Sequence, residues 1–293
     1  PAPASAPWRP VLRATPAAVR EHLRHRDLAL TAGGLTFYAV LAAVPAVLVS
    51  GKLASLALGA DTVRAFGAAT DAALPDALGA GPVARGLIDA AASVGWIGFV
   101  AAVFPASLYG EGLRRAYSVL GPGAHRERFL GWRGRIGTLP VLGVAPALLV
   151  AVLAITPLLA ELMSGGIGST ALGVYVALNV DWIVVSIPLA WTFRIVAPDH
   201  LPWTAAIVGG FTTGAFISGF LQGFVLFLAL PLDLGLPFGG LVAVGGAIAV
   251  VLWMWLLHAV MLLGYLATRC AVHLHASASA GPGVAALRGA TAT

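Results

Sequence analysis

An acidic residue within an apolar run is the feature of this sequence with the clearest chemical consequence. Asp181 lies in the middle of ALNVDWIVVSIPLAW, residues 177–191, two positions after Asn179. An acid at the centre of a bilayer costs about 2.5–3.5 kcal/mol on insertion scales, and such acids commonly mark ion or proton pathways. Two interpretations have equal weight. Asp181 either fixes helix packing, or it binds a proton or ion in a hydrated interior.

Two more polar residues are expected at a similar depth. At about 1.5 Å of rise per helical residue, His258 falls slightly to one side of the membrane midplane and Gln222 slightly to the other. Asn179, Asp181, Gln222 and His258 therefore form a candidate intramembrane polar site. The packing interpretation expects Asp181 to be protonated or hydrogen-bonded to Asn179, His258 or a backbone carbonyl.

The remaining histidines do not suggest a catalytic or metal centre. Metal-dependent RNA hydrolysis needs His and carboxylate ligands clustered on a water-exposed face. The seven histidines of the chain are His22, His25, His125, His200, His258, His273 and His275. The HLH pair at 273–275 has no carboxylate cluster beside it, and no Gly-rich phosphate loop is present. We therefore expect no enzyme activity, no catalytic residue, no metal and no cofactor, and no nucleic-acid partner.

The composition indicates whether water or lipid surrounds the folded chain. Of the 293 residues, 59% are hydrophobic and only 10% are charged, whereas soluble domains carry about 25% charged residues. The mean hydropathy is +0.92. A fold so poor in charge could not cover a water-exposed surface, so the sequence predicts an all-α integral membrane protein. The single cysteine, Cys270, excludes an intrachain disulfide.

Apolar runs of about 20 residues predict six transmembrane helices. The expected spans within a domain of residues 29–270 are about 29–51, 93–113, 138–160, 171–193, 204–230 and 239–266. Residues 1–28 are expected to form a tail and an amphipathic surface helix, with Thr15 as N-cap and Pro16 in the first turn. The long loop 52–92 is expected to contain two short helices, and residues 271–293 a disordered tail.

The basic residues predict the orientation of these spans. Of the 17 Arg and Lys residues, only Lys52, Arg64 and Arg85 fall on one side when both termini lie on the other. Because Arg and Lys concentrate in cytoplasmic flanks, both termini are expected in the cytoplasm. The expected location is a bacterial inner membrane, with the protein crossing it several times.

A basic stretch and a glycine pattern indicate binding or packing contacts and no catalytic role. Arginines near 114–135 enforce topology, and four of them are candidates for contacts to anionic lipid headgroups or a cytoplasmic partner: Arg126, Arg128, Arg133 and Arg135. In the fifth span, small residues four apart permit close helix packing at Gly210, Gly214, Gly219 and Gly223. Association into a homo-oligomer stays open.

Three segments resemble those of one known family. They are GGLTFYAVLAAVP at 33–45, FRIVAPDHLPWTAAIVGG at 193–210 and FGGLVAVGGAIAVVLWMWLLHAVMLLG at 238–264. Their succession resembles the YihY/BrkB family, some of whose members carry a ribonuclease BN-like label. The family's last span commonly ends in Leu-Gly-Ala-Glu, whereas LLGYLATR places Leu266 where that glutamate would stand. The resemblance implies a six-span bacterial inner-membrane protein.

Three functions remain open after these observations. The first is export or translocation of a lipid-like or amphipathic substrate by a cell-envelope protein, which the absence of catalytic clusters and the family's association with the envelope favour. The second is a proton- or cation-coupled solute transporter that uses the candidate polar site. The third is a structural or assembly protein without a substrate. Membrane lipids are expected partners in each case.

Overall fold

The computed structural model describes residues 7–24, 26–73, 81–121, 131–144, 148, 166–228, 230 and 232–279, and the regular elements in them are all helical. Five of these helices are long and apolar enough to cross a membrane: α2 (Leu28–Leu58), α5 (Trp96–Leu120), α7 (Ile167–Trp191), α8 (Trp203–Leu228) and α9 (Val242–Ser279). The expected all-α membrane architecture is confirmed.

The third expected span, 138–160, is described only in part. Residues 131–144 are helical, whereas 145–147 and 149–160 lie outside the described residues. The count of six spans and the cytoplasmic position of both termini therefore stay predictions. The other expected spans coincide with helices, although α2 is longer than the span expected at 29–51.

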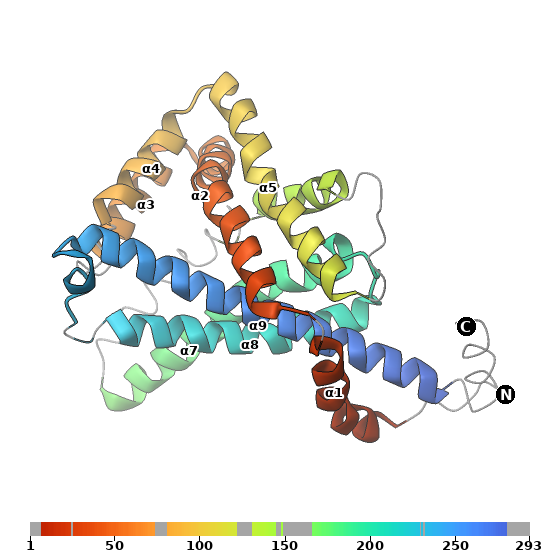
Figure 1. The fold of residues 1–293 in the computed structure, drawn as a ribbon. Coiled ribbons are helices and arrows are strands. Elements are labelled where there is room, and N and C mark those ends of the chain that lie inside the picture. The colour runs from red at the N-terminus through yellow and green to blue at the C-terminus, as the bar shows by residue number, and fades with distance from the viewer. Residues whose placement is uncertain are drawn as a thin grey trace.

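The helices pack as two antiparallel pairs around α9. Helix α2 packs on α5, and α7 packs on α8, while α9 lies between the pairs and contacts both α2 and α8 (Figure 1). The largest buried apolar cluster joins these helices and includes Leu35, Tyr117, Phe193, Leu262 and Tyr265. The core therefore lies where α9 crosses between the two pairs.

The expected pair of short helices between the first two spans is present. Helices α3 (Ala60–Ala73) and α4 (Gly81–Ser93) pack against each other and against α2. They lie at one end of the molecule together with η3 (Leu236–Phe238) and the start of α9, while α1 lies at the opposite end (Figure 1).

The expected start of the first helix is wrong. Helix α1 (Trp8–Leu23) begins at Trp8, and Thr15 is inside it, where its hydroxyl donates to the Val11 carbonyl at 2.9 Å. Pro10 fits the first turn because amide hydrogens there have no helical acceptor. Contacts with α9 extend the helix: Val11 is buried, and the Trp8 ring stacks on His275 at 3.9 Å between centroids.

The end of α9 also differs from expectation. The disordered tail was expected from 271 and the span to end at 266, but α9 continues to Ser279. Residues 267–279 are rich in alanine, a strong helix former, and α1 packs along this part of the helix. Residues 280–293 of the expected tail lie outside the described residues.

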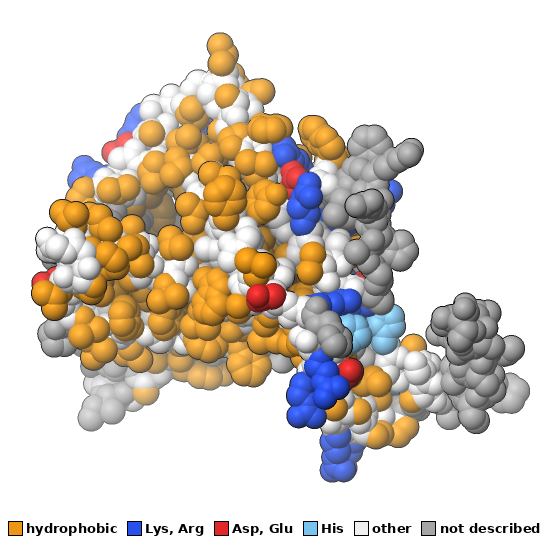
Figure 2. Space-filling view, viewed as in Figure 1, with side chains coloured by type: hydrophobic (Ala, Val, Ile, Leu, Met, Phe, Trp, Pro, Cys, Tyr) orange, Lys and Arg blue, Asp and Glu red, His pale blue; other side chains and the backbone are white. Residues whose placement is uncertain are grey.

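Large apolar side chains cover much of the visible surface (Figure 2). Among the exposed large apolar side chains of the chain are Ile97, 90% exposed, and Leu226, 71% exposed, on two of the candidate spans. A water-soluble monomer rarely exposes an apolar surface of this extent. This exposure is the expected property of helices that face lipid.

Candidate functional site

A cavity of about 660 Å³ lies between α2, α5, α7, α9 and the helical residues 131–144. Its α2 wall is a stripe of small residues, Ala39, Ala42, Ala43 and Ala46. The other walls are mainly Val, Leu, Ile and Met, and no Asp, Glu, Lys or Arg is among the lining residues that the structure describes. The volume is within the range of small-molecule sites, about 300–1,000 Å³. The cavity therefore suits an apolar guest.

A series of hydrogen bonds through His258 reaches the cavity wall. His258 is 6% exposed and bonds Thr36 Oγ1 through Nδ1 at 2.9 Å and Tyr109 Oη through Nε2 at 3.0 Å. Thr36 donates its only hydroxyl hydrogen to the Ala32 carbonyl at 2.8 Å, so His258 Nδ1 must be the donor to Thr36. In the neutral ring, Nε2 then accepts from Tyr109. These hydrogen bonds connect α2, α5 and α9, and the Tyr109 side chain lies on the cavity wall.

Three aromatic rings lie next to the cavity, toward the α1 end of the molecule. Leu113 and Met261 line the cavity, and Tyr117 and Tyr265 lie one turn further along the same helices. Their rings meet at 4.3 Å between centroids, and Phe193 packs its edge against Tyr265 at 5.5 Å. All three residues are fully buried. Phe193 belongs to the π-helical segment Thr192–Val196, a geometry that often marks functional sites.

An ion pair with a buried arginine and a partly exposed carboxylate lies directly beyond these rings. Arg269 on α9, whose side chain is 2% exposed, pairs with Asp199 in the link between α7 and α8. The Tyr265 hydroxyl donates to the same carboxylate at 3.0 Å, and Arg269 Nη1 donates to the Leu120 carbonyl at 2.9 Å. The pair therefore joins α9, the end of α5 and the α7–α8 link. The sequence did not predict this pair, because Arg269 was considered only as one of the basic residues that indicate the orientation of the spans.

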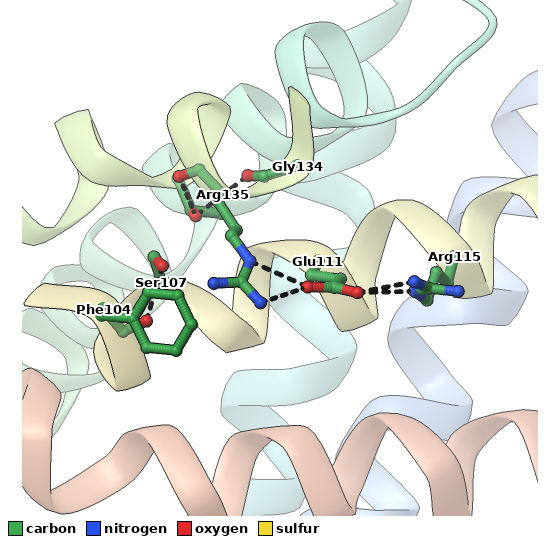
Figure 3. A network of polar contacts seen from close by, with 7 residues as sticks. Phe104, Ser107, Glu111, Arg115, Gly134 and Arg135 are labelled. Atoms are coloured by element: carbon green, nitrogen blue, oxygen red, sulfur yellow. Dashed lines mark hydrogen bonds and ion pairs between the residues drawn. The ribbon is translucent and has the colours of Figure 1, made fainter. Parts of the chain in front are cut away.

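A second polar network lies where α5 meets residues 131–144 (Figure 3). The Glu111 carboxylate bonds Arg135 Nη2 at 2.6 Å on one oxygen and Arg115 Nη2 at 2.6 Å on the other. The Arg135 guanidinium also lies 4.5 Å from the centroid of the Phe104 ring. A Cβ on Gly110 would collide with the Gly134 carbonyl, so these glycines permit the close approach. This network fixes the third expected span against α5.

The four headgroup candidates therefore have different environments. Arg135 is half-buried and bonded to Glu111, whereas Arg133 is exposed. Arg126 and Arg128 lie outside the described residues. Contact of any of them with lipid headgroups stays a prediction.

The structure does not bring the four polar candidates together. Asp181 is half-buried and accepts a hydrogen bond from Ser218 on α8 at 2.6 Å. Asn179 donates to the Tyr175 carbonyl of its own helix at 2.8 Å, and His258 is hydrogen-bonded to Tyr109. Gln222, on α8, is half-buried. Ser218 is the partner that sequence reasoning did not find.

Asp181 nevertheless lies on the face of α7 that lines the cavity further along the helix. Val184, Val185 and Pro188 line the cavity, and Asp181 precedes them at the spacing that shares a helix face. It lies one turn from the cavity wall, away from the aromatic rings. In the described residues, no group of three or more His, Cys, Asp or Glu side chains could hold a metal ion.

The four helix-packing candidates also separate into two kinds. A Cβ on Gly210 would lie 2.6 Å from the Ala190 amide nitrogen, and one on Gly214 would collide with the Ser186 side chain. Both glycines thus lie against α7. A Cβ on Gly219 would have no neighbouring atom within 4 Å, and one on Gly223 would lie 3.8 Å from the Trp253 ring.

Comparison with known proteins supports the resemblance found in the sequence. A family model described as Virulence factor BrkB matches residues 19–285. The search of curated proteins and the search of solved structures found no match.

Proposed function

Because the chain belongs to the Virulence factor BrkB (YihY) family of membrane proteins, we propose that it is a non-enzymatic inner-membrane protein of the bacterial envelope. We further propose that it translocates a lipid-like or amphipathic molecule. The observation that carries this proposal is the cavity between α2, α5, α7 and α9, whose described lining residues are mainly apolar and include no charged side chain.

The cavity chemistry favours an amphiphile over a hydrophilic solute. A bare ion or sugar would lose its hydration against alanine, valine and leucine and would find few partners in return. An apolar chain gains about 25 cal/mol for each Å² that it removes from water. The Tyr109 hydroxyl oxygen, whose hydrogen is donated to His258, can still accept a hydrogen bond from the polar end of such a molecule.

The fully buried rings and the ion pair behind them support a transport cycle with one closed end. Tyr117, Phe193 and Tyr265 separate the cavity from the α1 end of the molecule. For a substrate to leave on that side, these rings must move apart. Phe193 belongs to a π-helical segment, a geometry that is frequent at functional sites.

Translocation is measured with the purified full chain in liposomes that contain a trace of fluorescent, nitrobenzoxadiazole-labelled phosphatidylethanolamine. Dithionite added outside reduces only the label in the outer leaflet. We expect the protein to bring the inner-leaflet label to the outside, so that nearly all fluorescence is lost. Loss confined to the outer leaflet, as in protein-free liposomes, would refute the proposal for this class of substrate.

One observation favours the second candidate, a proton- or cation-coupled transporter. Asp181 lies on the cavity side of α7, next to residues that line the cavity. Its bond to Ser218, however, fits a role in α7–α8 packing equally well. The two roles differ in whether the negative charge is needed.

Replacing Asp181 separates these roles. We expect Asp181→Asn to keep the wild-type translocation rate and melting temperature, because an amide oxygen can still accept from Ser218. Asp181→Ala should lower stability by about 1 kcal/mol, because Ser218 loses its partner. Both are measured by thermal unfolding in detergent and by the liposome assay. Lost translocation in Asp181→Asn at an unchanged melting temperature would instead favour coupled transport.

A further inference from the structure

A second hollow lies on the side of the molecule formed by α8 and α9. It has a volume of about 1140 Å³, and none of its described lining residues also lines the central cavity. On α8 it extends from Thr204 to Phe220, and on α9 from Val260 to Ala276. These helices lie side by side (Figure 1), and both are candidate membrane spans. We call this hollow the α8–α9 groove.

Close helix packing creates the floor of the groove. A Cβ on Gly209 would collide with Thr268, and one on Gly264 would collide with Thr213, so the two helices touch at these points. The hydroxyls of Thr213 and Thr268 donate to carbonyls of their own helices at 2.7 and 2.8 Å. These two threonines therefore need no polar partner in the groove.

The rims of the groove are apolar and exposed. Phe216 is 63% exposed, Val208 66% and Leu263 36%, on helices that are candidates to cross a bilayer. The sixteen helical rises from Thr204 to Phe220 correspond to a length of about 24 Å. One leaflet of a hydrocarbon core about 30 Å thick is shorter than this. The groove can therefore hold an acyl chain along its length.

Helix α1 forms the polar end of the groove. Trp8, Leu12 and Thr15 line it, and they share one face of α1. Beside that face, the exposed residues Arg9, Arg13, Arg20 and Arg24 form a basic stripe, visible as blue side chains along α1 in Figure 2. His275 also lines the groove, and its Nδ1 is a buried atom without a hydrogen-bond partner. This end can receive a negative charge.

We propose that the α8–α9 groove binds one anionic glycerophospholipid. Its acyl chain lies between α8 and α9, and its phosphate lies at the α1 end, near Arg9, Arg13 and His275. An acyl chain satisfies the apolar rims, and a phosphate complements the basic stripe. The site is separate from the central cavity, so it does not depend on translocation.

Native mass spectrometry of the full chain in detergent tests this site. The protein is titrated with palmitoyl-oleoyl phosphatidylglycerol and, in parallel, with phosphatidylcholine that carries the same chains. We expect tighter binding of one phosphatidylglycerol. The double variant Arg9→Gln/Arg13→Gln should weaken that binding about tenfold and remove the preference for the anionic lipid. The control Arg64→Gln removes an exposed arginine from α3 and should have no effect.

A second pair of variants tests the position of the acyl chain. Thr212→Phe fills the groove and should weaken binding of both lipids, whereas Ile207→Phe adds the same ring to α8 outside the groove lining. Equal binding of the two lipids to the wild type, or unchanged binding in the arginine double variant, would overturn the proposal. Loss of translocation with phosphatidylglycerol binding intact would contradict only the function proposed for the cavity.

Discussion

Replacing Asp199 by alanine is expected to destabilise the protein by about 3–5 kcal/mol, because it leaves a buried guanidinium without its carboxylate. Arg269 is 2% exposed, and its remaining acceptor is the Leu120 carbonyl. The Tyr265 hydroxyl also loses its acceptor. In detergent, the apparent melting temperature should fall by about 10 °C.

The exposed ion pair on α3 supplies the matched control. Asp61 bonds Arg64 at 2.7 Å, but its side chain is 99% exposed, so Asp61→Ala should cost less than about 1 kcal/mol. The double variant Asp199→Ala/Arg269→Met should recover part of the loss, because it also removes the unpaired charge. If Asp199→Ala melted at the temperature of Asp61→Ala, the Arg269–Asp199 pair would not hold the three segments together.

Filling the central cavity should slow lipid translocation at least tenfold, a change of about 1.4 kcal/mol in barrier height. Ala39 and Ala46 line the cavity seven residues apart on one face of α2, so Ala39→Phe/Ala46→Phe places two rings inside it. The rings occupy space that the substrate needs. Translocation of labelled phosphatidylethanolamine in liposomes measures the effect.

The neighbouring positions on α2 give the control. Val40 and Val47 are 44% and 38% exposed and lie outside the cavity lining, so Val40→Phe/Val47→Phe adds the same two rings to the outer surface. This variant should translocate at the wild-type rate. Equal rates in both double variants would mean that the cavity is not on the substrate's path.

Hydropathy and length were sufficient to predict the class of fold. Apolar runs of the required length mark α2, α5, α7, α8 and α9 because burial in lipid demands them along a whole helix. The helix ends were less predictable. Contacts between α1 and α9 extend both helices, and these contacts join residues more than 250 positions apart.

The contacts between helices in the candidate site were even less predictable from the sequence. His258 and Asp181 were singled out because each is polar in an apolar run, and His258 does reach the cavity wall. Their partners, Tyr109 and Ser218, belong to other helices, and a pattern within one helix contains no information about which residues face each other. The Arg269–Asp199 pair was missed for the same reason.

Photocrosslinking tests the central claim, occupancy of the cavity by a lipid-like molecule, most directly. The protein is purified from membranes that contain a phospholipid with a diazirine in its acyl chain, irradiated, and mapped by mass spectrometry. We predict crosslinks in two peptides of the cavity wall, around Ala39–Ala46 and Met254–Met261. Crosslinks restricted to lipid-facing positions such as Ile97 and Leu226, with none in either peptide, would contradict the account.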